Sequence, residues 1–210
     1  MQNLEGHQRL AVVALVAWLF TSFLGAAVGG LFIAALGGTG AIWSTAALDN
    51  VDRASTICGI LYIVAFLFAV VCVARWIYRA SVNAHALSDA MWISPGWSIG
   101  WYFVPIANLF KPFQAMREIW QVSLVPRDPL SVPVPGLLRV WWGLWLLTNL
   151  LGRVSFQLGR NAHTISDLVM EGCIEVVTFA VDAALAIVLI RIIRQLTANQ
   201  RSIVDTRIFE

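Results

Sequence analysis

The residues that decide the fold class are 54–74, which read ASTICGILYIVAFLFAVVCVA. This run contains no charged side chain and is bounded by Arg53 on one side and Arg75 on the other. A helix that crosses the hydrocarbon core of a bilayer needs about 20 consecutive, mainly apolar residues. Residues 54–74 therefore predict a transmembrane helix.

The composition of the whole chain agrees with this prediction. Of its 210 residues, 59% are hydrophobic and only 12% are charged, and the mean hydropathy is +0.76. Soluble domains carry about a quarter charged residues, so a soluble fold is excluded. The formal net charge of +2 indicates neither a nucleic-acid partner nor an acidic one, and membrane lipids are the expected surroundings.

Three further apolar runs predict three more transmembrane helices. Residues 10–36 contain no charged side chain, residues 173–190 end at Arg191, and residues 137–158 can cross if Arg139 and Arg153 snorkel or find partners. We therefore expect an all-α bundle of four spans. The expected domain boundaries are a short cytoplasmic N-terminus at 1–9, a single membrane domain at 10–195 and a cytoplasmic tail at 196–210.

Residues 94–112, which read SPGWSIGWYFVPIANLFKP, form the least regular segment. The segment is apolar, but it is short for a span and is interrupted by Pro105 and Pro112. Non-helical backbone at membrane depth is tolerated only inside protein or beside water. We therefore expect a re-entrant or interfacial element, in which the Asn108 side chain bonds backbone groups freed near Pro105.

Residues 113–123 predict an amphipathic helix on the cytoplasmic surface. Polar residues recur there at helical spacing, and apolar residues occupy the other face. The polar set is Gln114, Arg117, Glu118 and Gln121, and the apolar set is Phe113, Met116, Ile119 and Trp120.

The distribution of basic residues predicts the orientation. With four spans, 11 basic residues fall on one side of the membrane and three, Arg53, Arg153 and Arg160, fall on the other. Basic residues concentrate on the cytoplasmic side, so both termini are expected in the cytoplasm. If 97–110 also crossed, this asymmetry would largely collapse.

One further pattern of residues runs through the centre of the chain. It consists of Arg79, Asn83, Ser94, Pro95, Gly96, Trp97, Gly100, Trp101, Pro105, Asn108, Leu109, Pro112, Ala115, Glu118, Ile119 and Trp120. This pattern resembles a family of bacterial membrane proteins catalogued as domain of unknown function 4328. The resemblance extends from Arg53 to Gln200, about 70% of the chain, and it implies a multi-pass protein of the bacterial inner membrane without an established activity.

Asp182 is the candidate functional residue within a span. It lies nine residues before Arg191, roughly 13 Å deep at the helical rise, where an ionisable group is costly. It either pins two helices together, with Asn149 as its partner at a similar depth, or takes part in a proton or ion relay. We favour the pinning role because a relay usually needs several such groups.

A second set of polar residues lies at the cytoplasmic level. Arg79 and Asn83 are one turn apart. An ion pair with Glu118 and a hydrogen bond from the Asn83 amide would lock the surface helix onto the bundle. The alternative is a pocket for a lipid headgroup or another anion. That pocket would be lined by Arg79, Asn83, Asn108, Lys111 and Gln114.

No cofactor or metal site is expected from the remaining residues. The three histidines, His7, His85 and His163, fall outside the predicted spans, and no motif of a nucleotide-binding or hydrolytic enzyme is present. The cysteines form no CxxC pair. We therefore expect a non-enzymatic, oligomeric interaction or scaffold protein whose central motif is structural. The alternative is a small transporter or a lipid- or anion-handling protein with its site at 94–112. A water-accessible cavity between Asn108 and Asp182 would favour the transporter, and a tightly packed interior the scaffold.

Overall fold

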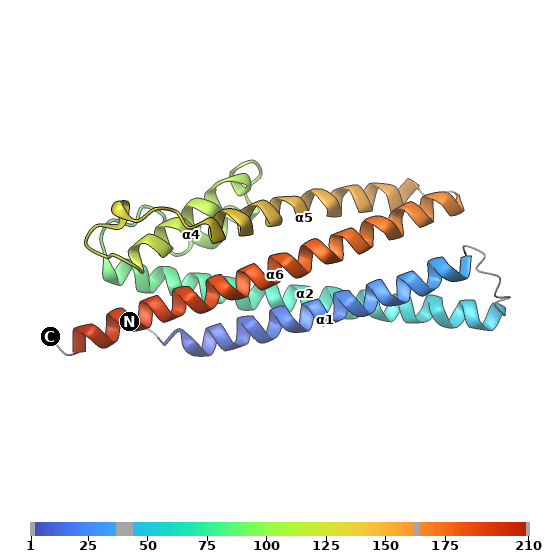
Figure 1. Cartoon of the computed structure of the whole chain (residues 1–210), viewed down its shortest axis with the longest axis horizontal. Coiled ribbons are helices and arrows are strands. Elements are labelled where there is room, and N and C mark those ends of the chain that lie inside the picture. Colours follow the sequence, from blue (N-terminus) through green and yellow to red (C-terminus); the bar gives the residue numbers. More distant parts are fainter. Residues whose placement is uncertain (1–2, 37–43, 162–163, 209–210) are drawn as a thin grey trace. The chain divides into compact units, whose positions relative to one another are not determined.

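The computed structural model describes residues 3–36, 44–161 and 164–208, and these residues form helices and connecting turns without a strand. Five helices account for most of them (Figure 1). The all-α prediction is therefore confirmed. The helices are α1 (Glu5–Leu36), α2 (Thr45–Leu87), α4 (Lys111–Val122), α5 (Gly136–Asn161) and α6 (Ile165–Ile208).

Three of these helices, not four, are long and apolar enough to cross a membrane by length and composition. Within the described residues, the candidate spans are Glu5–Leu31, Asp49–Leu87 and Met170–Ile203. The expected span at 137–158 lies in α5, which has 26 residues but is less apolar. The reason is its content of polar side chains, which includes Arg139, Asn149 and Arg153.

The chain divides into two compact units. Unit 1 comprises residues 1–14, 69–143 and 187–210, and unit 2 comprises residues 15–68 and 144–186. Helices α1, α2, α5 and α6 each contribute one end to each unit.

Helices α2 and α6 continue well beyond the predicted spans. They contain 43 and 44 residues, about 65 Å at the helical rise, whereas the hydrocarbon core is about 30 Å thick. The expected boundary between the last span and a tail, at 195/196, falls inside α6. Residues 196–200 are not a free tail, because Leu196, Thr197 and Gln200 are buried.

In unit 1, the amphipathic pattern of 113–123 forms α4 with nearly the predicted bounds. The apolar face is buried, with Met116 and Ile119 almost fully inaccessible and Trp120 close to it. Pro112 occupies the first turn, where its missing N–H leaves no helical bond unmade. Burial of this face holds α4 in unit 1.

The segment 94–112 contains no helix that could cross a bilayer. It consists of one turn of α-helix, α3 (Trp97–Gly100), followed by the 3-10 turns η1 (Trp101–Phe103) and η2 (Ala107–Leu109). These turns pack against α4 within unit 1. Pro105 interrupts the helix as expected, because Val104 before it takes an extended conformation.

Candidate functional site

Unit 2 contains an open cleft of about 480 Å³ that the sequence did not predict. Residues from α1, α2, α5 and α6 line it. Its polar lining comes from hydroxyl groups and two carboxyl groups, and three aromatic rings contribute to its walls. The polar residues are Thr21, Ser22, Ser55, Tyr62, Ser155, Glu175, Thr178 and Asp182, and the remaining rings are Phe156 and Phe179.

Asp182 lies in this cleft and is only 4% exposed. Its carboxylate accepts a hydrogen bond of 2.9 Å from the Thr148 hydroxyl on α5. The expected partner, Asn149, is exposed and donates instead to the Trp145 carbonyl of its own helix, at 2.7 Å. The link between α5 and α6 therefore exists, but the residue next to Asn149 makes it.

Three hydroxyl groups of the cleft lining donate to backbone carbonyls of their own helices. The hydroxyls of Thr21 and Ser22 donate to the Trp18 carbonyl, at 2.8 and 2.9 Å, and Thr178 donates to the Ile174 carbonyl, at 2.8 Å. A hydroxyl has one proton and two lone pairs, so with the proton used in this bond each oxygen can still accept a hydrogen bond from a group in the cleft. The cleft thus presents oxygen acceptors beside its carboxyl groups.

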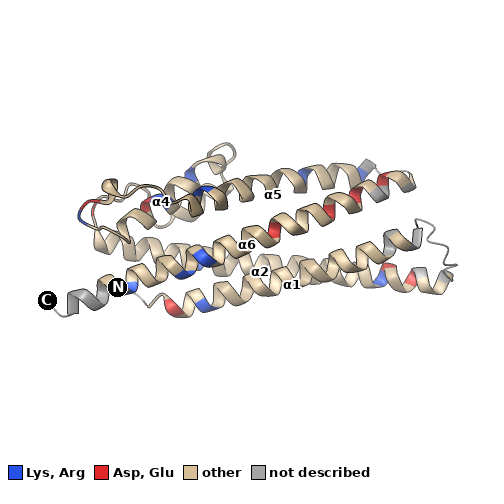
Figure 2. Ribbon diagram, in the orientation of Figure 1, with Lys and Arg blue, Asp and Glu red and all other residues tan. Residues whose placement is uncertain are grey.

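Glycines make room for the carboxyl groups of α6. A Cβ atom at Gly29 of α1 would lie 3.5 Å from a Glu175 carboxyl oxygen, and one at Gly159 of α5 would overlap a Glu171 carboxyl oxygen. Acidic residues recur along the unit 2 part of α6, as Figure 2 shows. Glu175 joins Asp182 in the cleft, whereas Glu171 does not line it.

Unit 1 contains a buried polar network centred on Gln200, which is 2% exposed. Its amide nitrogen donates to the Ala80 carbonyl and to the Ser123 hydroxyl, both at 2.9 Å, and its oxygen accepts from the Asn83 amide at 3.2 Å. One turn earlier, the Trp76 indole donates to Thr197 at 3.1 Å. These bonds join α2, α6 and the end of α4.

The structure therefore changes the expected role of Asn83. Its amide is buried and donates to the Gln200 side-chain oxygen on α6. Glu118 instead accepts the backbone N–H groups of Trp92 and Ile93, both at 3.1 Å. Glu118 thus holds against α4 the residues that directly precede segment 94–112, which is called the broken segment below. Arg79 lies half-buried on α2.

The broken segment places its own candidate residues together. The rings of Trp97 and Trp101 lie 4.4 Å apart, and the Lys111 ammonium lies 5.7 Å from the Trp101 ring centre. The Val104 carbonyl accepts the backbone N–H of Asn108 at 2.9 Å, and the Trp101 carbonyl, four residues before Pro105, accepts the Val104 N–H at 3.4 Å. Burial raises the pKa of the Tyr102 phenol, which keeps it protonated.

The other motif residues are mostly structural. Ser94 and Pro95 start the α3 turn by accepting bonds from Ser98, and the Gly100 backbone approaches the Trp97 ring closely. Gln114 is half-buried on α4. Gly96 has open space around it rather than a helix packed against it.

Several site residues escaped the sequence reasoning. The sequence did not single out Thr148 as a partner of Asp182, because a threonine in a span is common. It did not place Glu175 with Asp182, because Glu175 lies near the end of the predicted helix. A spacing of seven between Glu175 and Asp182 places both on one helical face, and this was the available signal. Gln200 and Thr197 had no signal, because they lay in a predicted tail.

The metal-ligating residue types do not gather in the described part of the chain. No group of three or more His, Cys, Asp or Glu side chains there is arranged to hold a metal ion. Cys58 and Cys72 are buried free thiols, and Cys173 is an exposed one. His163 lies outside the described residues.

Comparison with known proteins adds the family. No curated protein and no solved structure matches the chain. A family model matches residues 40–198, which include the broken segment, α4 and the residues of α2, α5 and α6 that line the cleft. Because the match covers well over half of the chain, the resemblance based on the central motif is confirmed. The chain belongs to the family described as "Domain of unknown function (DUF4328)".

Proposed function

We propose that this protein is a small, non-enzymatic membrane transporter that binds an organic cation in the unit 2 cleft. The observation that carries the proposal is the cleft itself, with two carboxyl groups and a set of hydroxyl acceptors. None of the described residues that line it is basic. A cleft that offers negative charge and oxygen lone pairs favours a positively charged ligand.

The aromatic walls favour an organic cation over a bare metal ion. Tyr62, Phe156 and Phe179 line the same cleft as Asp182. Aromatic faces attract ammonium groups, and this attraction strengthens where water is excluded. A volume of about 480 Å³ also lies within the range of pockets that hold small organic ligands.

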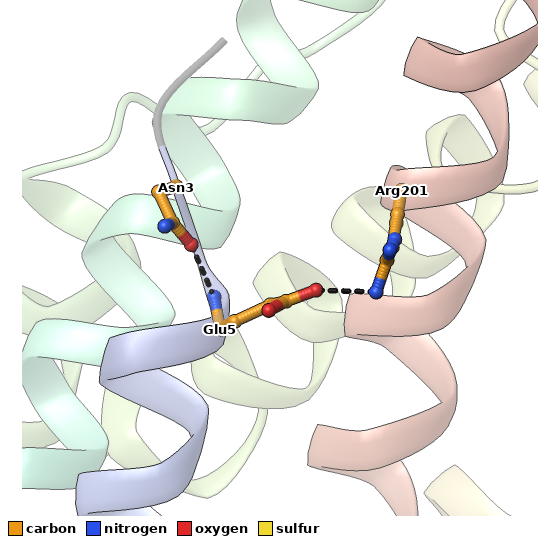
Figure 3. A network of polar contacts seen from close by, with 3 residues as sticks. All are labelled: Asn3, Glu5 and Arg201. Carbon is orange, nitrogen blue, oxygen red and sulfur yellow. Dashed lines mark hydrogen bonds and ion pairs between the residues drawn. The ribbon is translucent and has the colours of Figure 1, made fainter.

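Two observations support the topology that this function needs. Glu5 at the start of α1 forms an ion pair with Arg201 near the end of α6, with Asn3 bonded to the Glu5 backbone (Figure 3). The start of α1 and the later part of α6 thus lie together in unit 1. This contact supports an even number of crossings, in which α5, although less apolar than the other three helices, would be the fourth.

The distribution of basic residues supports cytoplasmic termini. Unit 1 contains 11 of the 14 basic residues, and unit 2 contains Arg53, Arg153 and Arg160. These two groups of basic residues are the same as the two that the four-span prediction placed on opposite sides of the membrane. Unit 1 then belongs to the cytoplasmic side of a cytoplasmic membrane.

Binding of radiolabelled tetraethylammonium to the purified chain in lipid nanodiscs tests the proposal. Asp182→Asn should weaken binding by about tenfold or more, because it removes a buried charge that faces the ligand. Glu175→Gln should weaken it to a smaller extent, because Glu175 is exposed. Thermal unfolding of each variant separates loss of binding from loss of fold.

Glu171→Gln is the matched control. It removes a carboxyl group from the same helix, one turn before Glu175, that does not line the cleft. Its affinity should stay within about twofold of the parent chain. Equal binding by the parent chain and Asp182→Asn would overturn the organic-cation assignment, as would displacement of the bound tetraethylammonium by sodium alone. Absence of binding would favour the scaffold role instead. Uptake into proteoliposomes then tests transport.

A further inference from the structure

We propose that residues 103–110, here called the interfacial turn, insert their apolar side chains into the headgroup boundary of an anionic bilayer and anchor unit 1 there. The turn lies in the broken segment and does not line the cleft. The inference is therefore independent of the cation-binding proposal.

The backbone of the interfacial turn is held in a rarely used conformation. Ile106 has φ 67° and ψ −53°, and the Ala107 N–H donates to the Pro105 carbonyl at 2.7 Å. This geometry is that of the γ-turn with positive φ, which is strained for residues other than glycine. A β-branched residue there is a marked outlier, and such strain points to a use for the side chain.

The side chains at this turn are apolar and exposed. Phe103 is 77% exposed, Ile106 76% and Leu109 54%, and the neighbouring Phe110 is also exposed. In water this arrangement is unfavourable, since each large apolar side chain gains roughly 1.5–3 kcal/mol on burial. The bilayer that surrounds the chain can supply that burial without a further partner.

The turn is fixed to the helices beside it. The Trp142 indole at the start of α5 donates to the Leu109 carbonyl at 3.2 Å, and the ring of Phe113 on α4 lies 6.3 Å from that of Trp142. In Figure 1 the turn lies beside α4 and the start of α5. Insertion would therefore hold these two helix ends at the membrane surface.

Charge and residue type both match an anionic lipid surface. Trp97, Trp101 and Lys111 stand at the two ends of the turn, and indoles and lysines are the side chains that concentrate at headgroup level. Unit 1 contains 11 basic and six acidic residues. The net positive charge favours the leaflet with anionic lipids.

Depth-dependent quenching of a fluorophore tests the insertion. The label is attached to Phe103→Cys in a chain whose three native cysteines are replaced, and the protein is reconstituted in nanodiscs containing brominated phosphatidylcholine with or without phosphatidylglycerol. Quenching should exceed that of the same label at Ala90→Cys by about twofold or more. Ala90 is the matched control because it is exposed in unit 1 outside the turn.

Two substitutions separate insertion from stability. Ile106→Gly removes the inserted side chain but relieves the positive-φ strain, so the melting temperature should hold or rise while quenching at position 103 falls by about half. Lys111→Gln should reduce the extra quenching that phosphatidylglycerol produces. A label at position 103 that is quenched no more than that at position 90 overturns the proposal, as does cross-linking between two copies through Phe103→Cys, which would assign the turn to a dimer.

Discussion

The carboxylate of Asp182 on α6 accepts a hydrogen bond of 2.9 Å from the hydroxyl of Thr148 on α5. The same carboxylate lines the unit 2 cleft. Asp182 thus joins two helices and faces the space in which we place a cation. Helix pinning and cation binding are therefore compatible roles for this one residue.

Thr148→Val should separate these two roles. Valine preserves the shape of threonine but cannot donate, so the buried carboxylate loses its donor and the chain should lose about 1–3 kcal/mol of stability. Thermal unfolding in nanodiscs measures this change. Asn149→Ala is the control and should change stability by less than about 0.5 kcal/mol, since its side chain is exposed. A larger effect at Asn149 than at Thr148 would restore Asn149 as the partner.

Gln200→Leu should destabilise unit 1 by about 2–4 kcal/mol, because the Asn83 amide and the Ala80 carbonyl would lose a bonding partner in a buried site. Chemical denaturation monitored by tryptophan fluorescence measures it. Arg201→Ala is the comparison: it breaks a surface ion pair with Glu5 and should cost at most about 1 kcal/mol. Similar losses for both variants would contradict the central role of Gln200.

Gly29→Leu should fill part of the cleft. A Cβ atom added at Gly29 would lie 3.5 Å from a Glu175 carboxyl oxygen. The larger leucine side chain would therefore extend into the space that the ligand would occupy. Tetraethylammonium binding should fall by about tenfold or more while the fold is retained. Gly6→Leu, on the same helix with open space around it, should leave binding unchanged. Retained binding in Gly29→Leu would place the ligand elsewhere.

Asn108→Leu should be mild, in contrast to the expectation that its side chain satisfies backbone groups near Pro105. The backbone N–H of Asn108 bonds the Val104 carbonyl, and leucine keeps that group. The change in unfolding free energy should stay below about 1 kcal/mol. A melting temperature that drops sharply would show that the amide carries a structural bond.

Cysteine labelling tests the even number of crossings. Single cysteines at Asn3 and Ser202, in a chain without its native cysteines, should react with an impermeant reagent from one side, because the Glu5 to Arg201 ion pair brings the two ends together. A cysteine at Ser166, near the start of α6, should react from the other side. Labelling of Asn3 and Ser202 from opposite sides would mean three crossings and would remove α5 from the membrane.

Membrane character, helical content and the bounds of α4 could be read directly from the chain. Run length and the spacing of apolar residues are local properties, and a bilayer or a helix face selects for them without reference to distant residues. The break at Pro105 belongs to the same class, since proline restricts its own backbone and that of Val104. The 54–74 run alone predicted an apolar helix long enough to cross a bilayer, and the structure contains it.

The partners of Asp182 and Gln200 could not be read in this way. Rotation by one residue along a helix turns a side chain by about 100°, so depth alone could not choose between Thr148 and Asn149. Gln200 is polar and follows the last apolar run, and only the continuation of α6 beside α2 and α4 buries it. The cleft likewise arises where small residues on several helices meet, because its volume is a property of their packing rather than of any one segment.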